Sequence, residues 1–281
     1  MMLATIRDGS RTAAVRVDGD LLVETGQPDV DALLAEPGWR DIAAAAAGAT
    51  RPIEGADFAA VVQRPGKILC VGLNYRNHIL EMGRELPEYP TLFAKFSEAL
   101  IGPYDEIRLP PESDAVDWEA ELAVVIGGTV RRATTSDAEG AIAGFAILND
   151  VTLRDWQYRT PMWDQGKTWA DTTPLGPFLV TPDDLPGGMR PHLDLQATVN
   201  DEIVQKANTG DLVFEPVRLV EYVSTILTLR PGDVIATGTP GGVGHARKPA
   251  RYLGDGDVLG TEIECLGSAL NRAVSEQVPV R

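Results

Sequence analysis

The stretch Asp117-Trp118-Glu119-Ala120-Glu121 runs directly into the apolar segment Leu122-Ala123-Val124-Val125-Ile126. The apolar segment is typical of a strand inside a core. Because side chains alternate between the two faces of a strand, Asp117, Glu119 and Glu121 would share one face. Neighbouring carboxylates at the edge of a core repel one another, and a divalent cation such as Mg²⁺, which prefers oxygen ligands, would relieve that repulsion. The stretch therefore favours a buried strand with a metal site over the alternative of a solvated acidic edge.

The composition indicates a globular protein with a sizeable core. Of the 281 residues, 44% are hydrophobic and 23% are charged, and the formal net charge at pH 7 is −16. Such an acidic protein is a poor partner for nucleic acid or an anionic membrane, because both are negatively charged. The charge argues against these partners but does not by itself indicate a function.

The two cysteines, Cys70 and Cys265, both lie beside apolar residues in segments with strand-like patterns. We predict two buried free thiols rather than a disulfide, as is typical of proteins in a reducing compartment. No apolar run has the length of a membrane-spanning helix, and Arg7 and Asp8 interrupt the N-terminus where a signal sequence would have its apolar core. These features predict a cytoplasmic protein.

The segment Arg64-Pro65-Gly66 marks a change in the residue pattern, because short β-type segments separated by glycine and proline begin after it. Residues 1–64 predict a small N-terminal α/β domain with a hairpin over residues 2–17, a short helix capped by Asp31 and a second helix over residues 42–47. Residues 65–281 predict a larger, β-rich catalytic domain. The expected fold class is therefore α+β with a predominance of strands.

Short β-type segments separated by glycine and proline fill the larger domain. The expected strands cover residues 68–71, 122–126, 144–148, 193–199, 234–237 and 261–265. A helix is expected to begin at Pro216, because proline suits the first helical position. The apolar stripe of that helix consists of Val217, Val220, Val223 and Leu227.

Asp150 follows a predicted strand where the strand leaves the core. Taken alone, an aspartate there is more often a turn or capping residue. Together with Glu119 and Glu121 it would complete an open metal site of three carboxylates. Arg154 and Gln157 follow Asp150 at spacings of four and seven, which predicts that the three share one helical face. Arg154 would neutralise a carboxylate or bind an anionic substrate, unless it belongs to an ordinary surface helix.

His78 and Glu81 are three residues apart, so they would be neighbours on a helix, where the carboxylate could orient the imidazole as a general base. A structural or exposed histidine is the alternative. Lys167 is a lone lysine, and most such residues are solvated surface charges. Residues 237–244 form a glycine-rich loop without a P-loop pattern, and its backbone amides could approach the carboxylate of a small ligand. His245 follows this loop and could line the same site.

In their order along the chain, these segments resemble the fumarylacetoacetate hydrolase family between Lys67 and Val274. The matching motifs are Val71-Gly72-Leu73-Asn74-Tyr75, Asp117-Trp118-Glu119-Ala120-Glu121, Asn149-Asp150-Val151-Thr152, Pro174-Leu175-Gly176-Pro177, Pro231-Gly232-Asp233-Val234 and Thr237-Gly238-Thr239-Pro240. The resemblance implies a β-rich mixed α/β roll behind a small N-terminal domain, in a homodimer.

The resemblance also implies roles for particular residues. Mg²⁺, or Mn²⁺ in its place, would be bound by Glu119, Glu121 and Asp150. The catalytic residues would be His78 with Glu81, as a dyad that activates water, and Lys167. The substrate would contact Arg154, Gln157 and Thr239. Asp117 would then lie at the start of the strand or behind the ligands without binding the cation.

The activity that this resemblance implies is hydrolytic cleavage of a C–C bond in a 1,3-dicarbonyl acid of the acylpyruvate or fumarylpyruvate type. His78 would activate the water, and the cation with Lys167 would stabilise the departing enolate. Decarboxylation of oxaloacetate and isomerisation of 2-hydroxyhepta-2,4-diene-1,7-dioate are alternatives at the same site, and each also acts on a small oxo acid. An alternative of another class, a small-molecule binding protein without catalysis, would be expected to lack a ligand or the base, and none is missing.

Overall fold

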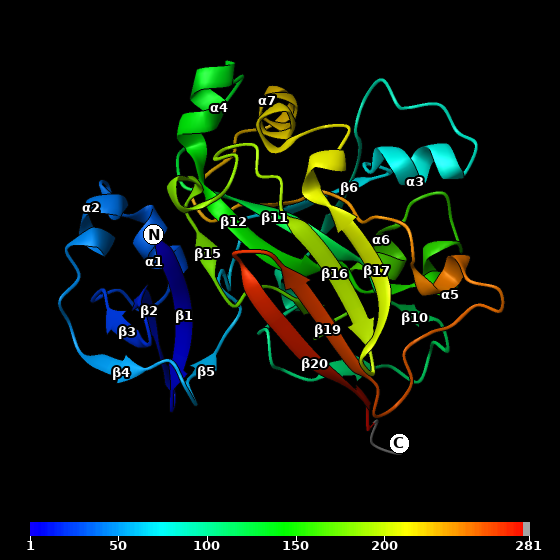
Figure 1. Ribbon diagram of the computed structural model, residues 1–281, viewed down its shortest axis with the longest axis horizontal. Coiled ribbons are helices and arrows are strands. Elements are labelled where there is room, and N and C mark those ends of the chain that lie inside the picture. Colours follow the sequence, from blue (N-terminus) through cyan, green and yellow to red (C-terminus); the bar gives the residue numbers. More distant parts are fainter. Residues whose placement is uncertain (278–281) are drawn as a thin grey trace.

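The computed structural model describes residues 1–277, and two β-sheets form its frame (Figure 1). The larger sheet has the strand order β4-β3-β2-β1-β15-β12-β11-β18-β6-β7, with β5 paired to β1. The smaller sheet has the order β17-β16-β19-β20-β9. The predicted β-rich α+β class is confirmed.

The strands of the larger sheet are β1 (Met2–Asp8), β2 (Arg11–Asp18), β3 (Leu21–Glu24), β4 (Thr50–Pro52), β5 (Asp57–Phe58), β6 (Ile68–Gly72), β7 (Thr91–Lys95), β11 (Ala120–Ile126), β12 (Ile142–Asn149), β15 (Leu179–Val180) and β18 (Val234–Ala236). Those of the smaller sheet are β9 (Ile107–Leu109), β16 (Asp194–Val199), β17 (Glu202–Asn208), β19 (Val258–Ile263) and β20 (Gly267–Ser275). Two short pairs stand apart, β10 (Val116–Asp117) with β13 (Thr152–Leu153) and β8 (Leu100–Ile101) with β14 (Thr173–Pro174).

The α-helices are short. They are α1 (Val30–Ala35), α2 (Trp39–Ala44), α3 (Arg76–Glu81), α4 (Thr135–Ala141), α5 (Arg154–Gln157), α6 (Asp164–Lys167) and α7 (Pro216–Ile226). Single 3₁₀ turns cover Ser97–Ala99, Pro182–Asp184, Thr209–Asp211 and Gly244–Ala246. In α7, Pro216 is the first helical residue and Val217, Val220 and Val223 are buried, as predicted. Among the described residues, no helix has the length and apolar character needed to cross a membrane.

The centre of the molecule is the antiparallel pair β11–β12, in which every residue is buried. Leu122 and Val124 lie in a core shared with the smaller sheet, whereas Ala123 and Val125 lie in a second core that also includes residues of α1. A strand covered on both faces has no polar side to show, which explains the uninterrupted apolar segment.

The N-terminal strands continue the larger sheet, because β1 pairs antiparallel with β15. Figure 1 shows this region at one side of the molecule, with α1 and α2 beside β1 to β4. The division between residues 64 and 65 stays a prediction, and the sheet continues across it.

Two details of the N-terminal prediction are wrong. The side chain that caps α1 belongs to Asp29, which accepts the N–H of Ala32 at 2.7 Å, while Asp31 accepts the backbone N–H groups of Gln63 and Arg64. The second helix does not cover residues 42–47 but begins at Trp39, whose indole is buried. It ends at Ala44, and the guanidinium of Arg16 donates to the carbonyl groups of Ala43 and Ala44 there.

The prediction for the cysteines is confirmed for Cys70 and wrong for Cys265. Both thiols are free, but only Cys70 is buried. The strand predicted over residues 261–265 ends at Ile263, and Cys265 lies in the turn to β20 with a φ of 63°. The turn directs its side chain to solvent.

Candidate metal centre and pocket

Strand register creates a cluster of three carboxylates. In the antiparallel pair β11–β12, Ala120 lies opposite Asn149 and Glu121 opposite Leu148. One step further, the N–H of Asp150 donates to the carbonyl of Glu119 at 2.8 Å, so these two residues face each other just beyond the sheet. One carboxylate oxygen from each of Glu119, Glu121 and Asp150 lies within 4.8 Å of the others, and all three side chains are buried.

The strand is interrupted before this cluster, and Asp117 points elsewhere. Residues 118 and 119 belong to no strand, since β10 pairs with β13 and β11 with β12. The Asp117 carboxylate accepts the backbone N–H groups of Gly244 at 2.7 Å and His245 at 3.0 Å, and also Nε of Arg154 at 2.7 Å. The prediction of one face shared by three acidic residues is therefore wrong for Asp117, which holds a loop and an arginine behind the cluster.

Arg154 links Asp117 to the cluster. Its Nη2 lies 2.7 Å from Glu119 Oε1, an ion pair that lacks hydrogen-bond alignment, and its Nη1 donates to Gln157 at 3.0 Å. The prediction that Asp150, Arg154 and Gln157 share one helical face is wrong, because Asp150 precedes the short strand β13 and α5 begins only at Arg154. The arginine reaches the carboxylates across the β10–β13 pair instead.

Two buried lysines neutralise part of the acidic charge. Lys167 Nζ lies 2.7 Å from both Glu119 Oε2 and Asp150 Oδ2, and Lys95 Nζ lies 2.7 Å from Asp150 Oδ1. Lys95 was not predicted from the sequence. It ends β7, an edge strand of the larger sheet, and its partner Asp150 lies 55 residues further along the chain, so no local pattern reveals the pair.

The charges in the cluster shift the pKa values of its members in opposite directions. Burial, and then the charges of Asp150 and Glu119, raise the pKa of Glu121 well above its ordinary value. Burial alone would also raise the pKa of Asp150, but Lys167 and Lys95 hold it below its ordinary value. The pKa of Lys167 is raised: burial opposes its charge, but Asp150 and Glu119 outweigh that effect. Glu121 is thus the carboxylate in greatest need of further positive charge.

The cluster fits a hard divalent cation. Glu121 has no lysine or arginine at ion-pair distance in the described chain, and its Oε2 accepts only the N–H of Gly238, at 2.7 Å. Gly238 has a φ of 101°, and a Cβ there would lie 2.8 Å from the carbonyl oxygen of Val71, so glycine is required for this approach. Three buried carboxylates are a donor set that Mg²⁺ or Mn²⁺ would bind.

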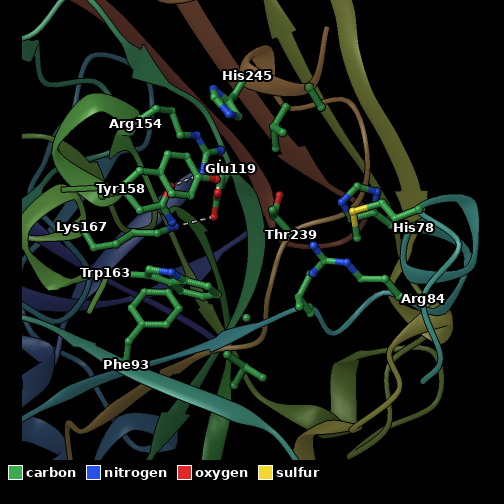
Figure 2. Close-up of a pocket in the computed structure, with 17 residues that line it drawn as sticks. His78, Arg84, Phe93, Glu119, Arg154, Tyr158, Trp163, Lys167, Thr239 and His245 are labelled. Carbon is green, nitrogen blue, oxygen red and sulfur yellow. Dashed lines mark hydrogen bonds and ion pairs between the residues drawn. The ribbon is translucent and has the colours of Figure 1, made fainter. Parts of the chain in front are cut away.

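A cavity of about 290 Å³ opens beside the cluster. Figure 2 shows Glu119, Arg154 and Lys167 toward one side of it and His78 with Arg84 toward the other. Further lining residues are Met82, Phe93, Gln157, Tyr158, Trp163, Thr239 and His245. The cavity brings together all the predicted catalytic and substrate-contacting residues except Glu81, and His245 lines it as expected.

Thr239 is fixed in the cavity wall by a glutamine that was not predicted from the sequence. Gln205, on β17, donates to Thr239 Oγ1 at 2.8 Å and to the carbonyl of Pro240 at 3.0 Å, while its own amide oxygen accepts the N–H of Ala120. Thr239 donates in turn to the carbonyl of Ala120 at 3.0 Å. A buried glutamine in a polar strand gives no pattern that distinguishes it from a solvated one.

His78 and Glu81 both lie on α3, as predicted, but no hydrogen bond joins their side chains in the described structure. Both approach Gly241, where a Cβ would lie 3.1 Å from His78 Nδ1 and 3.8 Å from Glu81 Oε2. Burial lowers the pKa of His78 and outweighs the charges of Glu81 and Glu119, which act in the opposite sense, while Arg84 makes a smaller contribution that also lowers it. The imidazole is therefore neutral at pH 7 and able to accept a proton.

Comparison with known proteins identifies the family. The model of the fumarylacetoacetate (FAA) hydrolase C-terminal domain matches residues 67–274. The chain belongs to the fumarylacetoacetate hydrolase family. This family assignment covers the pocket and supports an enzyme.

Several family members are similar over most of the chain. The mitochondrial oxaloacetate tautomerase Fahd2a of Rattus norvegicus is 48% identical over 77% of this chain and 69% of its own length. The solved structure of fumarylacetoacetate hydrolase from Exiguobacterium antarcticum has a TM-score of 0.88 at 30% identity, covering 98% of this chain and 100% of the other. A 5-carboxymethyl-2-hydroxymuconate delta-isomerase from Mycobacterium smegmatis has a TM-score of 0.83 at 32% identity, with the same coverage of 98% and 100%.

Proposed function

We propose that this protein interconverts the oxo and enol forms of a short 2-oxo diacid such as oxaloacetate, with Mg²⁺, or Mn²⁺ in its place, bound by Glu119, Glu121 and Asp150. The observation that carries the proposal is that Glu119, one member of the buried carboxylate cluster, and a neutral histidine line one cavity. The relative from Rattus norvegicus, an oxaloacetate tautomerase by name, supports the choice of reaction.

Conversion of the oxo form to the enol requires only the movement of a proton. The C3–H bond breaks, its electron pair forms the C2=C3 double bond, and the C2 oxygen gains negative charge and then a proton. His78 is suited to accept the C3 proton, because burial lowers its pKa and keeps the imidazole neutral at pH 7.

The residues around the cluster would orient the substrate. Lys167 and Arg154 carry positive charge on the side of the cavity where the oxo acid would bind, and Thr239 and Gln157 contribute polar groups to its wall. When bound, a divalent cation would supply Lewis-acid stabilisation of the charge that develops on the oxo oxygen. Tyr158 and Trp163 line the cavity as well, and their rings would limit the access of water.

Hydrolytic cleavage of an acylpyruvate is the second candidate, and the placement of Glu81 favours it. Because Glu81 approaches Gly241 together with His78, it could orient the imidazole toward a water molecule once substrate is bound. The two reactions share the cation site and differ in whether His78 accepts a proton from carbon or from water.

Exchange of the C3 protons of oxaloacetate with D₂O, followed by NMR in the presence of Mg²⁺, tests the proposal. We expect the protein to accelerate the exchange, and His78→Gln to reduce that acceleration by about 10²- to 10⁴-fold. Cleavage of acylpyruvates without any acceleration of the exchange would overturn the proposal in favour of hydrolysis.

A further inference from the structure

Arg84 differs from the other cationic side chains of the cavity. Lys167 and Arg154 are buried, and each is held by two carboxylates. Arg84 is exposed and lines the cavity, and it makes no ion pair or side-chain hydrogen bond within residues 1–277. Its guanidinium is thus free to bind an anion that enters the cavity.

The backbone positions Arg84 through the end of α3. Gly83 has a φ of 68°, its N–H donates to the carbonyl of Leu80 at 2.9 Å, and the N–H of Arg84 donates to the carbonyl of Ile79 at 3.2 Å. This pair of bonds is a Schellman motif, in which a residue with positive φ reverses the chain after the last helical turn. The reversal places Arg84 beside His78, and Figure 2 shows its side chain reaching into the cavity from that side.

The histidines of the cavity do not offer a comparable positive charge. Burial and the charge of Arg84 lower the pKa of His78, so its ring is neutral at pH 7. The Nδ1 atom of His245 lies 3.0 Å from the hydroxyl of Tyr252 and is engaged there. Arg84 therefore carries the guanidinium that is available to bind an anion at the part of the cavity formed by α3 and the turn after it.

We propose that Arg84 determines the specificity of this pocket for diacids by binding the carboxylate of the substrate that is remote from the oxo-acid end. This inference rests on the proposed function for the choice of a 2-oxo diacid. The oxo-acid end would lie at the carboxylate cluster, so the second carboxylate must extend into the rest of the cavity. A planar guanidinium can bind a carboxylate through two parallel hydrogen bonds.

The test compares oxaloacetate with its 4-methyl ester, which retains the oxo-acid end but lacks the remote charge. Arg84→Gln should raise KM for oxaloacetate by about 10- to 100-fold, with little change in kcat, and should leave KM for the ester unchanged. Arg84→Lys should restore part of the affinity. Arg76→Gln is the matched control, because Arg76 is an exposed arginine at the start of α3 that does not line the cavity.

Calorimetric titration of both compounds into the Mg²⁺-loaded protein separates this inference from the proposed function. If the wild type accelerates proton exchange in neither compound, the proposed function fails, yet the titration still reports on Arg84. The inference is supported if the wild type binds the diacid more tightly than the ester, and if this difference disappears in Arg84→Gln but remains in Arg76→Gln. Equal effects of Arg84→Gln on both compounds, or no effect on either, would overturn it.

Discussion

The two sides of the pocket are built in different ways. The carboxylate cluster of Glu119, Glu121 and Asp150 is positioned by the register of two fully buried strands, and it forms ion pairs with buried lysine side chains. The α3 side, which presents His78 and Arg84, consists of a six-residue helix and the turn after it, and much of it is exposed. The contrast suggests that the cation site is fixed by the core, whereas the α3 side can change its substrate contacts without disturbing the fold.

The largest effect should come from the cluster. Glu121→Gln removes the carboxylate that most needs a cation, so we expect loss of divalent-cation binding. Turnover should fall by about 10³-fold or more, since a bound cation contributes several kcal/mol to the stabilisation of developing charge. Steady-state assays with and without Mg²⁺ would check this, and a fully active Glu121→Gln protein would contradict the assignment of the cluster.

On the α3 side, the proton-transfer role of His78 predicts an acidic limit to activity. The pKa of His78 lies below its ordinary value of 6.5, because burial and Arg84 disfavour the charged ring. Activity should therefore persist to pH values below about 6.5 and fall as the ring becomes protonated. In Arg84→Gln the limit should move to higher pH, as a profile of kcat against pH would show; an unchanged limit would mean that another group titrates.

Asp117 links Arg154, which contacts the cluster, to the loop around Gly244. Its replacement therefore shows how much these links contribute to the stability of the fold. Asp117→Ala leaves buried Arg154 without one of its two carboxylates and removes the acceptor of three backbone N–H groups, those of Trp118, Gly244 and His245. We expect a loss of about 3–5 kcal/mol in the free energy of unfolding, measured by denaturant titration. Asp155→Ala, at an exposed aspartate nearby, serves as the control and should change stability far less.

The cluster should also make stability depend on pH in the cation-free protein. The folded-state pKa of Glu121 is raised above its ordinary value of 4.5, so its contribution becomes destabilising as pH rises above that value. Thermal unfolding should show this loss in the wild type and not in Glu121→Gln. Mg²⁺ at about 100 times its Kd should stabilise the wild type by about 2.7 kcal/mol.

The smallest effect is expected from Glu81. Since no hydrogen bond joins Glu81 to His78, Glu81→Gln should reduce proton exchange in oxaloacetate by less than about tenfold, the effect of one weak contact. The same variant should lose most of any acylpyruvate cleavage, because orientation of the imidazole matters when water must be activated. Parallel loss of both activities would show that the pair acts in both reactions.

The sequence predicted the strands well where one local pattern determined the outcome. The apolar segment after Glu121 and the valine stripe after Pro216 each imply burial directly. The sequence could not show that the strand breaks at Trp118 and turns Asp117 away, because that break depends on pairing with β13, far along the chain. Lys95, Gln205 and Arg84 were missed for the same reason, since each acquires its role only from residues brought close by the fold.

We propose that the cation site and the proton-transfer group lie on separable sides of one pocket. Mn²⁺ affinity by calorimetry and proton exchange in oxaloacetate by NMR, measured in Glu121→Gln and His78→Gln prepared side by side, test this separation. We predict that Glu121→Gln loses both Mn²⁺ binding and exchange, whereas His78→Gln binds Mn²⁺ like the wild type and loses exchange. Full Mn²⁺ binding by Glu121→Gln, or wild-type exchange in His78→Gln, would contradict this assignment.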